Sequence, residues 1–161
     1  MFKIKATIII ILSLILCLAS CGNKKYRNDL SCSDISEVIK NNDVKEFQPY
    51  GNDYLSYILS DTSCCNDFSI IYSRDANDID EFGVLHANSE EDADRLLKML
   101  GTYIEDAKND QRAFIASYAP NELSKLDSAR VQRFGNYVIY SISSEEAYKK
   151  ISSAIEALLA E

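Results

Sequence analysis

The sequence predicts an α+β fold, a two-layer sandwich in which a four-stranded antiparallel sheet carries its helices on one face. Two pairs of short segments rich in β-branched and aromatic residues are each joined by a turn signal. Each pair runs into a serine followed by apolar residues at helical spacing. One short helix precedes both pairs, so the expected order is α-ββα-ββα. Residues 32–161 suit a single domain with one core.

Residues 1–20 have the pattern of a lipoprotein signal peptide. Lys3 and Lys5 form a short basic segment, and residues 6–20 are apolar or small, a run shorter than the ~20 residues that span a bilayer. The run ends Leu18-Ala19-Ser20-Cys21, which resembles a bacterial lipobox. We therefore expect cleavage before Cys21, lipid such as palmitate on its thiol, and anchoring on the extracytoplasmic face of the cell membrane. An ordinary secretory signal or a membrane anchor is the alternative.

The expected mature chain begins with a polar segment and is strongly acidic. Residues 21–31 are expected to form a flexible tether. Cleavage removes two lysines and no acid, so the net charge of −8 becomes −10. This balance disfavours nucleic acid and charge-driven binding to anionic lipid, both of which depend on Lys and Arg. The lipid on Cys21 is thus the expected link to the membrane.

Three more cysteines follow Cys21 in the expected mature chain. An extracytoplasmic location permits disulfides, and the neighbours Cys64 and Cys65 are too close to pair with each other. A disulfide is expected from Cys32 to Cys64 or Cys65, and three reduced, buried cysteines are the alternative. With one histidine and no Cys-x-x-Cys spacing, no metal or cofactor is expected.

The elements follow in order along the chain. Asp34, three residues before Glu37, predicts a capped helix that ends near Asn42. Residues 43–67 give mixed signals, because Pro49 and Gly51 interrupt a helical spacing of tyrosines. Strands are expected at 68–72 and 81–87 around a turn at 75–78, and at 130–134 and 137–142 around Gly135-Asn136. Helices are expected from Ser89 to about Tyr118, before Pro120, and after Ser144.

The two ββα units align at an offset of 55 residues. Val84 then matches Ile139, and the cap Ser89 matches Ser144. A repeat would give a pseudo-twofold arrangement with a binding surface on the open face of the sheet. The alternative is that any capped amphipathic helix after a strand would match as well.

Several segments together resemble a known family. They are Asp80-Glu81-Phe82-Gly83-Val84, the pair Gln111 and Phe114, Tyr118-Ala119-Pro120-Asn121-Glu122-Leu123, and Gly135-Asn136-Tyr137-Val138. The set is similar to a family of uncharacterised lipoproteins of Gram-positive anaerobic bacteria, defined by a domain of unknown function. The resemblance covers about residues 68–142. It implies an extracytoplasmic lipoprotein and carries no activity, ligand or catalytic residue.

The expected function is a non-enzymatic binding or interaction module with an unknown ligand, whose partner is a membrane or cell-wall protein. Tyr50, Tyr54 and Tyr57 are the candidate ligand surface, because phenol rings combine apolar faces with a polar hydroxyl. Core packing is the alternative role for tyrosines. Residues 75–81 are acidic enough to suggest calcium, but a solvated hairpin turn explains them better. No catalytic residue is identified, and a small cell-surface hydrolase using carboxylates is the alternative function.

Overall fold

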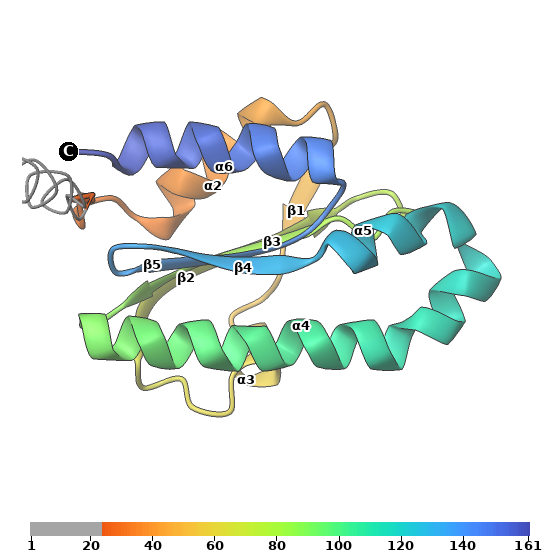
Figure 1. The fold of residues 1–161 in the computed structure, drawn as a ribbon, viewed down its shortest axis with the longest axis horizontal. Coiled ribbons are helices and arrows are strands. Elements are labelled where there is room, and N and C mark those ends of the chain that lie inside the picture. Colours follow the sequence, from red (N-terminus) through yellow and green to blue (C-terminus); the bar gives the residue numbers. More distant parts are fainter. Residues whose placement is uncertain (1–23) are drawn as a thin grey trace, which may run out of the picture.

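A computed structural model describes residues 24–161, so the expected signal peptide and Cys21 lie outside the described residues. Three layers make up the fold, with one antiparallel sheet between two layers of helices (Figure 1). The sheet has five strands in the order β1-β2-β3-β5-β4. The strands are β1 (Phe47–Pro49), β2 (Cys65–Ser73), β3 (Glu81–Ala87), β4 (Arg130–Phe134) and β5 (Tyr137–Ile142). The helices are α2 (Cys32–Asn42), α3 (Tyr54–Ile58), α4 (Glu90–Tyr118), the 3-10 turn η1 (Pro120–Glu122), α5 (Leu123–Ser128) and α6 (Glu145–Leu159).

Two separate apolar cores lie on the two faces of the sheet. On one face, Leu85 of β3 packs against Leu100 of α4, together with residues of α3. On the other, Phe82 of β3 packs against Ile35 of α2 and Ile155 of α6. We call these the α4 face and the α6 face. Alternate residues of β3 supply the two cores because successive side chains of a strand point to opposite faces.

The antiparallel sheet and the mixed α and β composition are confirmed, but the single helical layer is wrong. β5 is buried along its whole length, with Tyr137 in the α6 core and Tyr140 in the α4 core. A strand that is apolar on both faces needs cover on both faces, as in sheets enclosed between helices. The helices therefore divide between the two sides.

The count of four strands and the order α-ββα-ββα are also wrong, because β1 adds a fifth strand at the edge and α3 and α5 add two short helices. Phe47 pairs with Ser73 and Pro49 with Ile71 of β2. Pro49 has no N–H to donate, and an edge strand tolerates this. β1 lies within residues 43–67, for which the sequence gives no clear prediction. Its three residues are too few to show the alternation of apolar and polar residues that is typical of a strand.

The proposed 55-residue repeat is an accident of local pattern. Val84 does pair with Ile139, and Ser89 and Ser144 both cap helices. A twofold axis normal to the sheet would exchange antiparallel β3 and β5 and would leave both following helices on one face. α4 and α6 instead pack on opposite faces, so neither face of the sheet stays open as a binding surface.

Local chemistry sets the helix starts. The Ser89 hydroxyl accepts from the Asp92 amide at 3.1 Å, and the Ser144 hydroxyl accepts from the Ala147 amide at 3.2 Å. The first helix begins earlier than expected, because Ser31 is its N-cap and accepts from the amide of Asp34 at 3.1 Å. Within residues 24–161, none of the helices combines the length and the apolar character that crossing a bilayer requires.

Candidate functional site

Glu81 is a carboxylate at the start of an otherwise apolar strand. It opens β3 on the α4 face, opposite Tyr72 of β2 and Ile142 of β5, and is 7% exposed. Gly83 follows two residues later on the same face. Because Gly83 has no side chain, the ring of Tyr140 lies over it, which brings the Tyr140 hydroxyl to the Glu81 carboxylate.

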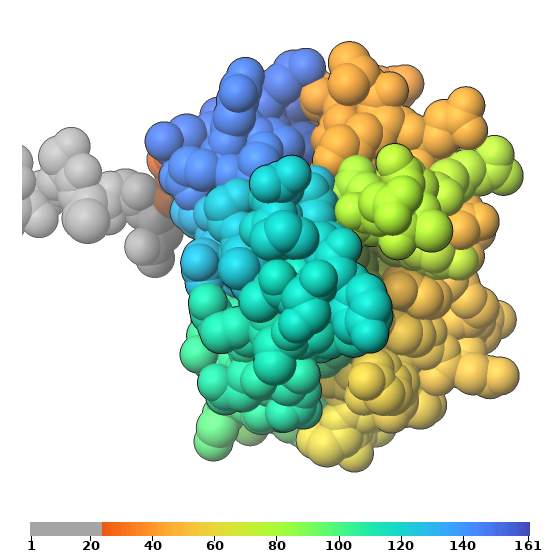
Figure 2. Space-filling model, turned by 90° about the vertical axis from the view of Figure 1, so that its right-hand side faces the viewer, coloured from red at the N-terminus to blue at the C-terminus, as the bar shows by residue number. Residues whose placement is uncertain are grey.

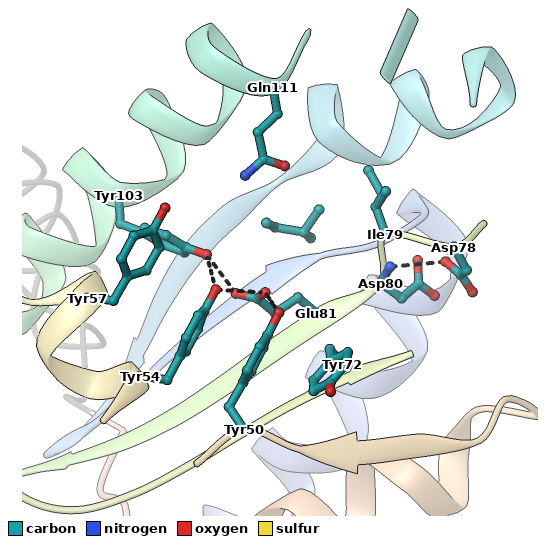
Figure 3. A pocket seen from close by; sticks show the side chains of 11 residues that line it. Tyr50, Tyr54, Tyr57, Tyr72, Asp78, Ile79, Asp80, Glu81, Tyr103 and Gln111 are labelled. Atoms are coloured by element: carbon teal, nitrogen blue, oxygen red, sulfur yellow. Dashed lines mark hydrogen bonds between the residues drawn. The ribbon is translucent and has the colours of Figure 1, made fainter. Parts of the chain in front are cut away.

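Four tyrosine hydroxyls donate to the Glu81 carboxylate (Figure 3). Tyr140 and Tyr103 donate to Oε1 at 2.7 and 2.8 Å. Tyr50 and Tyr54 donate to Oε2 at 3.2 and 3.3 Å, and the hydroxyls of Tyr54 and Tyr103 lie 3.1 Å apart. The donors come from β5, α4, α3 and the residue after β1, so the carboxylate joins four parts of the chain.

Burial dominates the acid–base properties of this cluster. It raises the pKa of Glu81, although each tyrosine bond acts to lower that pKa by favouring the charged form. Burial also raises the pKa of Tyr50, Tyr54, Tyr103 and Tyr140, and the nearby Glu81 carboxylate raises it further. The phenols therefore stay protonated and act as donors.

Four tyrosines form a column beside Glu81. The ring of Tyr50 stacks between Tyr72, with centroids 4.1 Å apart, and Tyr54, at 3.7 Å. Tyr57, one turn along α3, extends the column with a centroid distance of 5.4 Å to Tyr54. Tyr57 is 73% exposed, so the outer end of the column faces solvent.

This column, Tyr103 and Glu81 enclose a groove of about 200 Å³, which we call the tyrosine groove. Gln111 of α4 and Ile142 of β5 complete its walls, and residues 78–80 close one end. A second hollow of about 300 Å³ adjoins it and shares Tyr57 and Tyr103. Figure 2 views the end of the molecule where the 74–80 turn, the 45–60 segment and the second half of α4 meet.

An ion-pair cluster borders the groove where residues 78–80 close it. Lys125 contacts Asp78 at 2.6 Å, Asp80 at 2.9 Å and Glu122 at 2.5 Å, while Lys45 contacts Asp78 at 2.8 Å and also Asp80. Burial lowers the pKa of Lys125, but its bonds to the three carboxylates outweigh burial and raise that pKa. Asp80, which is 1% exposed, has its pKa raised by burial.

The three carboxylates of this cluster lie close enough to share a metal ion, with their oxygens within 4.8 Å of one another. Lys125 already provides the positive charge at their centre. We therefore interpret the cluster as structural. The rest of the acidic turn is a hydrogen-bonded turn, in which the Asn77 amide donates to Asp75 at 2.9 Å.

The sequence indicated part of this site. Tyr50, Tyr54 and Tyr57, the candidate ligand surface, do lie together in one column. Sequence reasoning missed Glu81 as the residue that the tyrosines surround, along with Tyr72, Tyr103 and Tyr140. One signal was present, since Glu81 begins a strand whose other residues are almost all apolar.

The three described cysteines carry free thiols. The Sγ atoms of Cys32 and Cys65 both donate to the carbonyl oxygen of Asp67, at 3.4 and 3.1 Å, whereas Cys64 donates to Asp61. Burial raises the pKa of Cys65 to about 11 and that of Cys32 further. The thiols of Cys32 and Cys65 are therefore neighbours, because they share one acceptor. The disulfide itself stays a prediction.

Comparison with known proteins gives a family and no function. No curated protein and no solved structure matches the chain. One family model, the Domain of unknown function (DUF4358), matches residues 55–143. The matched region contains Tyr57, Glu81, Tyr103 and Tyr140, and it covers more than half of the chain. The chain therefore belongs to the DUF4358 family.

Proposed function

We propose that this chain is a lipid-anchored lipoprotein on the extracytoplasmic face of the membrane, and that its tyrosine groove binds a ligand with a positively charged amino group. The anchor rests on the lipobox at residues 18–21. The binding function rests on one observation above all, the buried Glu81 carboxylate to which four tyrosine hydroxyls donate.

The hydrogen bonds to Glu81 determine what the groove offers a ligand. A phenol has one proton and two acceptor lone pairs. Tyr50 and Tyr103 each direct that proton to Glu81, so their oxygens are left as acceptors. A ligand that donates hydrogen bonds suits such a surface, and one that only accepts does not.

The charge of the lining favours the same class of ligand. Among the described residues, the lining holds five tyrosines, three carboxylates and no lysine, arginine or histidine. Lys45 and Lys125 pair with Asp78 and Asp80, so Glu81 is the lining carboxylate without a lysine partner within residues 24–161. A cation is attracted both by buried carboxylates and by the faces of phenol rings. The exposed outer ring of Tyr57 provides such a face.

The same geometry gives a carboxylate hydrolase less support. Glycoside hydrolysis by two acids needs a second carboxyl group free to act beside the first. Here Glu81 is engaged by four hydroxyls, and Asp78 and Asp80 are engaged by Lys45 and Lys125. Binding of a cation is compatible with these contacts, whereas hydrolysis would require at least one carboxylate to break them.

The test is a titration of the full-length lipidated protein in detergent micelles with butylammonium, followed by tyrosine fluorescence, since the chain has no tryptophan. We expect saturable binding that weakens about two- to fivefold, or about 0.5–1 kcal/mol, in Tyr57→Leu, as for a cation over an exposed aromatic ring. Tyr118→Leu is the matched control, because Tyr118 is equally exposed at 77% but lies outside the groove. Binding that is lost equally in both variants, or absent in the parent, would refute the proposal.

Glu81→Gln tests the carboxylate itself. It should weaken butylammonium binding at least as strongly as Tyr57→Leu, because it removes the charge beneath the hydroxyls. Circular dichroism checks that the variant folds. If Glu81→Gln folds and binds as tightly as the parent, the carboxylate is not part of the binding site.

A further inference from the structure

The first described residues are fastened to the far end of the chain. The Arg27 amide donates to the Leu159 carbonyl at 2.9 Å, and the Glu161 amide donates to the Lys25 carbonyl at 3.2 Å. These bonds flank an antiparallel bridge between Tyr26 and Ala160. Residues 25–27 therefore pair with residues 159–161, where α6 ends and the chain continues beyond it, as a short strand would.

Side chains hold the same segment against the β4–β5 hairpin. The ring of Tyr26 meets the ring of Phe134 edge-on, with centroids 5.6 Å apart, and its Cβ lies beside Gly135. The Tyr137 hydroxyl accepts from the Leu30 amide at 3.0 Å and donates to the Leu30 carbonyl at 2.6 Å. The chain from Tyr26 to Leu30 is thus attached to the hairpin at both of its ends.

We propose that the domain sits directly on the lipid headgroups, with the end formed by Lys24, Lys25, the Gly135-Asn136 turn and Glu161 facing the bilayer. This inference rests on the lipid at Cys21 in the proposed function. Three Cα steps separate Cys21 from Lys24, which reach at most about 11 Å. A domain of this size has a radius of gyration of ~14 Å. The attachment is therefore too short for the domain to turn over.

The orientation places the groove's acidic end away from the membrane. The chain enters the domain beside the C-terminus and the β4–β5 turn, and the β2–β3 turn that carries Asp78 lies at the opposite end (Figure 1). A ligand arriving from outside therefore meets the groove without crossing the lipid surface.

Charge contributes little to this orientation. Lys24 and Lys25 lie near Glu90 and Glu161, and the Lys24 ammonium is already paired with Glu156. The short covalent attachment is what orients the domain, so salt should not change the orientation. An electrostatic contact would instead weaken from about 0.1 M to 1 M salt, as the Debye length falls from ~10 Å to ~3 Å.

The experiment uses the full-length lipidated protein in phosphatidylcholine vesicles whose headgroups carry a nitroxide quencher. A genetically encoded fluorescent residue is placed at Asn136, or at Ser117 in the second half of α4 as the matched control. We expect quenching several-fold stronger at 136 than at 117, and unchanged by added salt. Equal quenching at the two positions, or a difference that salt abolishes, would overturn the proposed orientation.

A longer attachment gives a second readout. Insertion of about ten Gly and Ser residues before Lys24 adds up to ~35 Å of reach. Quenching at 136 should then fall to the level at 117, and persistence of the difference would show that something other than the attachment orients the domain. Mass spectrometry and co-sedimentation report the lipid independently, with Cys21→Ser as the unlipidated control. A parent chain that lacks lipid would refute the anchor and the orientation together.

Discussion

The ring of Tyr140 occupies the space beside Gly83, across the pairing of β5 with β3. A Cβ atom at residue 83 would lie 2.0 Å from Cε1 of Tyr140, so no larger residue fits without displacing the ring. This contact positions the hydroxyl that donates to Glu81 at 2.7 Å. A glycine in the middle of a strand thereby determines the geometry of the tyrosine groove.

Gly83→Ala should destabilise the domain by about 1–3 kcal/mol, because the added methyl group overpacks the core and displaces Tyr140. Urea unfolding measures the change. The control is Gly101→Ala in α4, where a Cβ meets nothing within 4 Å. That variant should gain about 0.5–1 kcal/mol from helix propensity. Equal effects of the two substitutions would show that the contact between residues 83 and 140 is not tight.

Glu81 should make stability fall as pH rises. Its pKa is raised in the folded protein, so the folded state binds the proton more tightly than the unfolded state. The stability that protonation provides is complete below the ordinary value of 4.5 and is lost as pH rises through the raised pKa. Glu81→Gln should remove this loss. The difference between parent and variant isolates Glu81 from His86, whose lowered pKa has the opposite effect. Parallel pH profiles would contradict the expectation.

Leu100→Ala should lower stability by about 2–5 kcal/mol, as for the loss of a large buried side chain. Leu100 is fully buried between α4 and the sheet. Val44→Ala serves as the control because Val44 is completely exposed, and it should have almost no effect. A melting temperature for Leu100→Ala within a degree or two of the parent would contradict this packing.

A disulfide, if one forms after export, should join Cys32 to Cys65. Both thiols contact the carbonyl oxygen of Asp67, whereas the Cys64 thiol contacts the carbonyl oxygen of Asp61. Peptide mapping under non-reducing conditions identifies the pair, and Cys64→Ser should leave it intact. A bond from Cys32 to Cys64 would contradict the geometry.

Elements that depend on neighbouring residues could be predicted from the sequence. β3, β4 and β5 have the bounds that their pattern indicates, because hairpin turns and serine caps act within a few residues. The side of the sheet that each helix covers could not be predicted. The side that a helix covers depends on the direction in which the chain turns after β3 or β5. The alternation of apolar residues in these strands permits either direction.

The centre of the candidate site escaped prediction for a related reason. The hydroxyl partners of Glu81 lie between 22 and 59 residues away in sequence, in four different parts of the chain. Nothing local distinguishes Glu81 from the many acids that end a turn. The sequence indicates Tyr50, Tyr54 and Tyr57 through their near-helical spacing and the binding chemistry of phenol rings. Their relation to Glu81 depends on β1 pairing at the sheet edge, which the sequence did not indicate.

The most direct test compares three probes of nearly the same shape: butylammonium, butanol and butyrate. Isothermal titration calorimetry of the full-length lipidated protein gives the affinity of each. We expect butylammonium to bind at least about tenfold more tightly than butanol, a difference of ~1.4 kcal/mol, and butyrate to bind weakest, because the groove presents the Glu81 carboxylate and the acceptor oxygens of the tyrosines. Equal affinities for the three probes, or a preference for butyrate, would contradict the proposal that the tyrosine groove is a site for cations.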